Sequence, residues 1–286
     1  MPPTLARMAV RVVTDSACDL PEEMAAELGV EVVPLPIRFG DTEFVDRRDL
    51  SPAAFYAKLA SSSVLPETAA PSPGAFEVAF RTLLDEGADA IVCVNISSSL
   101  SATMQSARNA VTALGDAAEV AVIDSRSVSW GLGSQVVAAA RAAAGGATLG
   151  EVTALVEGMV PRTRVYCALD TLENLKKGGR IGGAQALLGT LLSIKPVIDV
   201  SSGEVEEAGK PRTRTKALRF LAEKVARHGS VENLAVMHGG APDVEQFLEL
   251  LAPLCPRERI HVGEIGATIG AHAGPRVMGA TFQVGG

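Results

Sequence analysis

The sequence has few aromatic residues and few cysteines, and no apolar run long enough to cross a membrane. Aromatic side chains make up 4% of the 286 residues. The four cysteines stand far apart, and none has a neighbour at the spacing of a zinc site or a redox motif. We therefore expect free thiols in a reducing cytoplasm and no metal site. A membrane span needs about 20 consecutive apolar residues, so we expect at most transient contact with a membrane surface.

Positive charge is also scarce. The chain has 26 lysines and arginines against 33 acidic residues, which gives a net charge of −7. Proteins that bind nucleic acid need a basic face to contact the phosphates, so this balance argues against that class. Residues 1–7 are too short and too weakly apolar for a signal peptide. These features together predict a cytoplasmic globular protein with one large or two medium domains.

What the sequence does have is a cluster of hydroxyl groups at residues 97–103, with four serines and one threonine. The apolar run at 90–94 before it is typical of a buried parallel strand, and the pattern at 104–114 after it predicts a helix. Ligands of open α/β sheets bind where a strand ends and a helix begins. Capping that helix needs only one hydroxyl, so we favour a site for a carboxylate or a phosphate.

Two basic segments are further candidates. Residues 178–183 hold four glycines around Arg180, which allows a sharp bend and leaves the guanidinium free to contact a ligand. This segment lacks the order of a P-loop, and a solvated turn explains it equally well. Residues 210–216 form the most basic stretch of an acidic protein. They suit either a solvated edge or a docking surface for an anionic partner.

The order of strands and helices predicts the domain organisation. From residue 9 to the helix that begins near 130, strands and helices alternate, as in a parallel sheet covered on both faces. Gly131 and Gly133 in that helix have no third glycine at the spacing of a dinucleotide loop, so we expect them to allow close packing of the helix on the sheet. A second α/β unit begins near residue 161. We therefore predict domains at 8–160 and 161–286.

Taken together, these segments resemble the DegV family of bacterial fatty-acid-binding proteins, which act as binding subunits of a fatty-acid kinase. The resemblance covers nearly the whole chain. Each motif is weak alone, but all occur in the family's order. The matching segments are Thr14-Asp15-Ser16, residues 97–103 (similar to Ser-Ser-Gly-Leu-Ser-Gly-Thr), residues 175–181 (similar to Lys-Gly-Gly-Arg-Ile), Ile194-Lys195-Pro196 followed by Arg212-Thr213, and His272-Ala273-Gly274-Pro275.

The resemblance implies an α/β fold of two domains. The N-terminal domain would hold a mostly parallel sheet with flanking helices, the C-terminal domain would be smaller, and a fatty acid would lie between them. Carried over by position, Thr68, Ser97 and Ser98 would bind the carboxylate of the fatty acid, supported by Arg180 and His272. The chain departs from the family at residue 276, where an arginine follows Gly-Pro instead of a glycine.

The resemblance also implies a partner. Arg212 and Arg214 match the region implicated in docking on the catalytic subunit of the kinase, which would phosphorylate the bound long-chain fatty acid for phospholipid metabolism. The chain itself would then be a non-catalytic binding subunit without a cofactor.

An enzyme is the alternative, either an acyl hydrolase that uses Ser97 or Ser98 as its nucleophile or a small-molecule phosphotransferase that uses the Arg180 loop. The sequence has neither a G-x-S-x-G elbow nor a P-loop, and its four histidines are scattered. We therefore prefer the binding protein.

Overall fold

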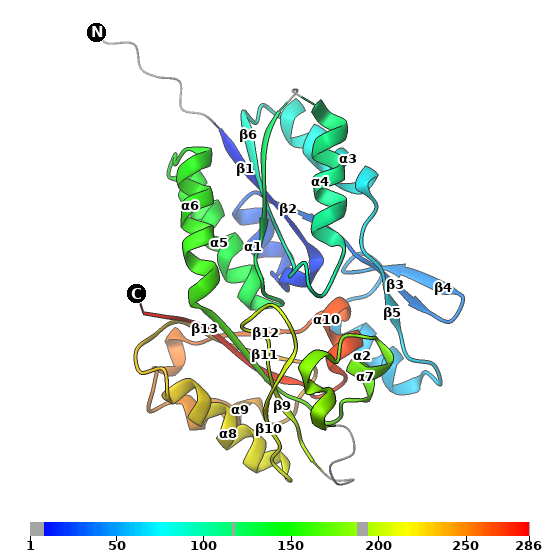
Figure 1. Ribbon diagram of the computed structural model, residues 1–286, viewed down its shortest axis with the longest axis vertical. Coiled ribbons are helices and arrows are strands. Elements are labelled where there is room, and N and C mark those ends of the chain that lie inside the picture. Colours follow the sequence, from blue (N-terminus) through cyan, green and yellow to red (C-terminus); the bar gives the residue numbers. More distant parts are fainter. Residues whose placement is uncertain (1–8, 116–117, 188–193, 286) are drawn as a thin grey trace.

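The first half of the chain builds a four-stranded parallel sheet in the order β2-β1-β6-β7. The computed structural model describes residues 9–115, 118–187 and 194–285 (Figure 1). The strands are β1 (Val10–Asp15), β2 (Val30–Val33), β6 (Ala90–Asn95) and β7 (Glu119–Asp124). Every residue of β6 is buried, as its continuous apolar sequence predicts for a central strand. β2 lies at the edge of the sheet, as expected from Pro34 and Pro36, because proline cannot donate a hydrogen bond to a neighbouring strand.

Helices cover both faces of this sheet, as the alternating pattern predicted. α3 (Pro73–Asp85) and α4 (Thr103–Leu114) pack on one face, and α5 (Trp130–Ala144) and α6 (Leu149–Met159) pack on the other (Figure 1). A short α1 (Glu22–Glu27) precedes β2. β1 and β6 run parallel, so both strands end at the same edge of the sheet, and the serine-rich segment begins there.

The close approach of α5 that we expected from its two glycines is confirmed. A Cβ at residue 131 would lie 2.1 Å from Oγ of Ser127, and a Cβ at residue 133 would lie 2.6 Å from the carbonyl oxygen of Cys18. Only glycine fits at either position, so both glycines serve packing.

A small antiparallel sheet in the order β4-β3-β5 was not predicted. It consists of β3 (Pro36–Phe39), β4 (Thr42–Val45) and β5 (Glu67–Thr68), with α2 (Pro52–Ser61) beside it. Phe39 and Phe55 of this unit pack with Ala267 and Ala271 of α10 (Ala267–Ala273), a helix near the end of the chain. The unit therefore links the first half of the chain to the second.

The second half of the chain forms a mixed six-stranded sheet in the order β10-β9-β8-β13-β11-β12. α8 (Arg214–Ala226) and α9 (Val244–Leu251) cover one face of it, and α7 (Glu173–Lys177) follows β8. The strands are β8 (Thr163–Ala168), β9 (Val197–Asp199), β10 (Glu206–Gly209), β11 (Val231–His238), β12 (His261–Glu264) and β13 (Met278–Val284). The short 3-10 helices are η1 (Ser16–Cys18), η3 (Val160–Arg162), η4 (Gly182–Leu187) and η5 (Arg257–Arg259).

The division at residue 160 remains a prediction. It falls between α6 and β8, but one hydrophobic cluster includes Val136 and Val156 on one side of it and Val165 and Met237 on the other. Residue 8, the first of the predicted N-terminal domain, lies outside the described residues. Among the helices of the described ranges, none combines the length and the apolar character needed to cross a membrane.

Candidate ligand-binding site

An apolar cavity of about 150 Å³ lies where the serine-rich segment, the small sheet, α10 and the face of the six-stranded sheet meet. Its walls are mostly aliphatic, and they come from both halves of the chain. The aliphatic lining includes Leu35, Ile96, Leu100, Val128, Leu175, Ile198, Val200, Val205 and Ile269. The polar lining residues are Thr68, Ser101, Arg180, Thr268 and His272. The cavity therefore suits a ligand that is mainly hydrocarbon with one polar end.

The polar end of the cavity brings together three residues that the sequence had singled out. Oγ1 of Thr68 and Nε2 of His272 are 2.8 Å apart and share a hydrogen bond. Nε of Arg180 donates to the carbonyl oxygen of Leu100 at 3.1 Å, which holds its guanidinium beside the serine-rich segment. Thr68, Arg180 and His272 also line a second, more polar pocket together with Lys177. They therefore stand at the junction of an apolar cavity and a polar one.

His272 is a neutral group at pH 7. Burial lowers its pKa to about 4, and the positive charge of Arg180 contributes to this shift. Its Nδ1 is buried and has no hydrogen-bond partner among the described residues. A neutral imidazole carries one N–H and one acceptor nitrogen, so the hydrogen bond with Thr68 can run in either direction. His272 can therefore either donate to an anionic ligand or orient the threonine that does.

Ser97 and Ser98 are not brought into this group. Oγ of Ser97 donates to the carbonyl oxygen of Gly203 at 2.6 Å, and the residue is 1% exposed. Oγ of Ser98 donates to the carboxylate of Asp124, which also accepts the backbone N–H of Ser98. Neither side chain lines the cavity. In this structure the two serines tie the segment to its neighbours instead.

Ser101 is the serine of this segment that does line the cavity, and the sequence indicated it only as one of the hydroxyl groups at residues 97–103. Its Oγ accepts the backbone N–H of Thr103 at 3.3 Å, at the start of α4. The position was open to inference, because Ser101 is the last serine before the predicted helix and so lies nearest to the helix N-terminus.

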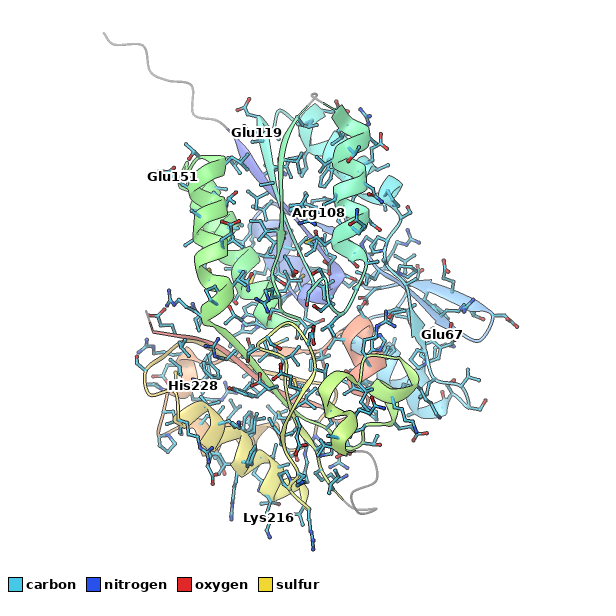
Figure 2. All side chains as sticks on the ribbon, in the orientation of Figure 1. Glu67, Arg108, Glu119, Glu151, Lys216 and His228 are labelled. Carbon is cyan, nitrogen blue, oxygen red and sulfur yellow. The ribbon has the colours of Figure 1, made fainter. Side chains whose placement is uncertain are left out.

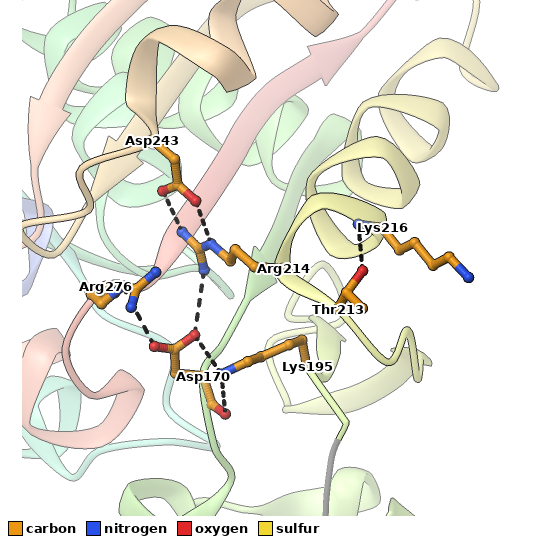
Figure 3. Close-up of polar contacts among 7 residues, drawn as sticks. All are labelled: Asp170, Lys195, Thr213, Arg214, Lys216, Asp243 and Arg276. Carbon is orange, nitrogen blue, oxygen red and sulfur yellow. Dashed lines mark hydrogen bonds and ion pairs between the residues drawn. The ribbon is translucent and has the colours of Figure 1, made fainter.

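The two arginines expected at a partner surface differ in their surroundings. Arg212 is exposed. The side chain of Arg214 is 13% exposed, and its Nε and Nη2 donate to the two carboxylate oxygens of Asp243 at 2.8 and 3.0 Å (Figure 3). Arg214 is therefore a member of an internal ion-pair network. Lys216, two residues further, points away from this network and outward from α8 (Figures 2 and 3).

Asp170 stands at the centre of the same network. It pairs with Nζ of Lys195 at 3.0 Å, with Nε of Arg276 at 3.6 Å and with Nη1 of Arg214 at 4.0 Å (Figure 3). Arg276 has a positive φ of 59°, a left-handed conformation that glycine adopts more readily than arginine. The arginine keeps that backbone conformation and adds a charge beside Asp170.

The remaining titratable groups give no sign of a metal centre. Over residues 9–115, 118–187 and 194–285, no cluster of three or more histidine, cysteine or acidic side chains is arranged to hold a metal ion. All four cysteines are free thiols, and Cys18 and Cys93 are buried.

The chain is similar to known proteins over nearly its whole length. The family model described as "Uncharacterised protein, DegV family" matches residues 9–284. The chain belongs to the DegV family. A DegV domain-containing protein of Deinococcus radiodurans is 36% identical over 286 residues, covering 96% of this chain and 99% of that protein. One from Streptomyces coelicolor is 35% identical over 278 residues, covering 96% and 98%.

Solved DegV structures have the same fold. A fatty-acid-binding DegV protein from Thermus thermophilus superimposes with a TM-score of 0.89 at 35% identity, covering 97% of this chain and all of that one (100%). A fatty-acid-binding DegV protein from Streptococcus agalactiae gives 0.88 at 27% identity, covering 98% and 100%. A DegV structure from Ruminococcus gnavus, described with vaccenic acid, gives 0.82 at 25% identity, covering 96% and 100%.

Proposed function

We propose that this chain binds a long-chain fatty acid, with the acyl tail in the apolar cavity and the carboxylate beside Thr68, Arg180 and His272. The observation that carries the proposal is that these three residues line both the apolar cavity and the polar pocket next to it. A fatty acid has the matching polarity, with hydrocarbon on one side of its carboxyl carbon and charge on the other. The fatty acids bound by DegV relatives support this assignment.

The energetics agree with a fatty acid. Burying each methylene group contributes ~0.8 kcal/mol, so a long chain supplies on the order of 10 kcal/mol before the costs of binding. A second apolar cavity of about 20 Å³ shares Val128, Cys167, Ile269 and Ala273 with the first. We propose that the tail continues in that direction, between the two predicted domains.

The carboxylate needs hydrogen bonds and a positive charge in such a site, because burying an unpaired anion is costly. Arg180 supplies the charge, and the hydroxyl groups of Thr68 and Ser101 supply donors. Ser101 takes the part in this proposal that the family resemblance implied for Ser97 and Ser98, since those two hydroxyl groups already donate elsewhere.

We further propose that the chain presents this carboxylate to a kinase catalytic subunit and is not itself a catalyst. The polar pocket beside His272 would give the partner access to the carboxylate. The exposed cations Lys210, Arg212, Lys216 and Arg219 at the start of α8 form a surface that suits an acidic partner. Arg214 is unsuited to direct docking because Asp243 already binds it. The hydrolase alternative is disfavoured, because Ser97 and Ser98 donate to a carbonyl and a carboxylate and not to a histidine.

Native mass spectrometry followed by lipid extraction tests the binding function. We expect freshly purified protein to carry a fatty acid, or the delipidated protein to take up oleate. Arg180→Ala and His272→Ala should each reduce the fraction loaded, whereas Ser98→Ala should load like the wild type. A wild-type protein that carries no lipid and takes up neither oleate nor palmitate would refute the proposal. Hydrolysis of an acyl ester that disappears in Ser97→Ala would favour the enzyme instead.

A further inference from the structure

Two buried carboxylates outside the cavity, Asp19 and Asp46, bind the start of α10. They are 4% and 1% exposed. A buried carboxylate destabilises a fold unless it is hydrogen-bonded, so the partners of these two indicate what they do. Neither residue lines the apolar cavity, and the proposed binding of a fatty acid does not use them directly.

Asp19 holds the backbone at the beginning of α10. Its Oδ1 accepts the N–H of Gly266 at 2.9 Å, and its Oδ2 accepts the hydroxyl of Ser129 at 2.6 Å. Gly266 occupies the N-cap position of α10 and has no side chain to cap the helix, so the carboxylate from residue 19 bonds this end from the other half of the chain. A Cβ at residue 266 would lie 2.8 Å from Oδ1 of Asp19, which explains the glycine.

Asp46 holds the first turn of the same helix through a side chain. Its Oδ2 accepts the hydroxyl of Thr268 at 2.6 Å and the hydroxyl of Ser16 at 2.8 Å. Oγ of Ser16 in turn accepts the backbone N–H of Leu35 at 3.1 Å. Asp46 therefore connects α10 to the end of β1 and to the chain between β2 and β3.

α10 depends on such contacts for its position. It has only seven residues, and a helix of that length is not stable by itself in water. Thr268 and His272 are four residues apart and so lie on one face of the helix, and both line the cavity. A shift of the first turn would therefore move the ring of His272 relative to Thr68, which lies on the small sheet.

We propose that Asp19 and Asp46 are positioning residues that fix α10 and thereby place His272 at the head of the ligand cavity. Ser16, from the Thr14-Asp15-Ser16 segment, takes part in this arrangement because its hydroxyl group donates to Asp46. The consequence for binding rests on the proposed fatty-acid function, whereas the consequence for His272 is a property of the ligand-free protein.

Two disruptive variants, each with a control variant, test the contacts that Asp46 and Asp19 make with α10. Asp46→Ala removes the acceptor for Thr268, and Asp46→Asn keeps an oxygen acceptor. Gly266→Ala places a methyl group against Asp19, and Gly150→Ala is the matched control because a Cβ there meets nothing within 4 Å. The measurements are the NMR signals of the His272 ring in delipidated protein and the affinity for oleate, both taken below the melting temperature of each variant.

We expect Asp46→Ala and Gly266→Ala to shift the His272 ring signals and to weaken oleate binding about tenfold. Asp46→Asn should restore most of both, and Gly150→Ala should change neither. Unchanged ring signals in folded Asp46→Ala and Gly266→Ala would overturn the proposal. Shifted signals with unchanged affinity would overturn its consequence for ligand binding. If the ring signals shift but the wild type itself binds no oleate, the fatty-acid function fails and the positioning of α10 stands.

Discussion

Gly178 lies directly against the ring of His272. A Cβ at residue 178 would come within 2.3 Å of Nδ1 and 2.9 Å of Cε1 of that ring. Gly178 has ordinary right-handed helical dihedrals, φ −74° and ψ −4°, so the backbone itself does not require a glycine here. The first glycine of the Gly-Gly-Arg segment therefore makes room for the histidine. This segment and the His272-Ala273-Gly274-Pro275 motif thus form one site.

Gly178→Ala is predicted to displace the His272 ring and to weaken retention of a fatty acid about tenfold with little loss of stability. Gly158→Ala in α6 is the control, because a Cβ there meets no atom within 4 Å and alanine favours a helix. Loading with oleate, read by native mass spectrometry, compares the two variants. Equal oleate loading of the two variants would contradict this prediction, because it would show that the position of the His272 ring does not affect binding.

Arg212→Glu and Arg214→Glu are predicted to behave differently although they are two residues apart. Arg212 is exposed, so its substitution should change the free energy of unfolding by less than about 0.5 kcal/mol. Nε and Nη2 of Arg214 donate to the two carboxylate oxygens of Asp243, and loss of the arginine leaves that partly buried carboxylate without its ion-pair partner. We expect Arg214→Glu to cost about 2–4 kcal/mol.

Urea unfolding of both variants tests that difference, and partner-dependent phosphorylation of bound oleate tests docking. Arg212→Glu should keep oleate loading and lose phosphorylation. A stable, fully loaded Arg214→Glu protein would contradict the internal role of this arginine.

The pKa of His272 predicts how stability depends on pH. In the unfolded chain this histidine takes up a proton near its ordinary pKa of 6.5, but in the folded protein it does so only near 4. Between these values the unfolded state binds more protons, so stability falls as the pH falls from 7 to 4. His272→Gln lacks this dependence. We expect the delipidated wild type to lose about 2–3 kcal/mol relative to the variant over this range.

Unfolding by urea at pH 7, 5.5 and 4 measures this difference. Burial raises the pKa values of Asp15 and Asp19 to about 6 and about 7, which acts in the opposite direction, but both proteins share these groups. Parallel pH profiles for the wild type and His272→Gln would show that the imidazole is not buried as described.

The sequence predicted the elements that local pattern determines. Three local patterns were interpreted correctly: the apolar run of β6, the helical spacing of α4 and the two glycines of α5. Each depends only on neighbouring residues, because a buried strand is continuously apolar and a closely packed helix needs small side chains. The small sheet was missed because β5 has only two residues and β3 begins with a proline. α10 was missed because its seven residues include a glycine and no apolar stripe long enough to show a period.

The site was predicted in part for the same reason. Arg180 stands out by the glycines around it and His272 was implied by the family resemblance, whereas the choice among the serines depends on partners far away in the chain. The partner of Ser97 is Gly203, 106 residues later. The exposure of Arg214 likewise depends on Asp243, 29 residues later. A pattern of neighbouring residues cannot show contacts between residues that are so far apart in the sequence.

Cys167 is predicted to control the length of the acyl chain. It lines both the main cavity and the smaller apolar cavity behind it, so its side chain borders the passage between them. Cys167→Phe should fill that passage and favour dodecanoate over stearate, whereas Cys167→Ala should widen it and keep the preference for the longer acid. The added ring should cost about 1–3 kcal/mol, so each variant needs a melting curve. Loading from an equimolar mixture of the two acids, followed by extraction and mass spectrometry, gives the ratio directly. The same ratio in both folded variants would mean that the tail leaves the first cavity by another route.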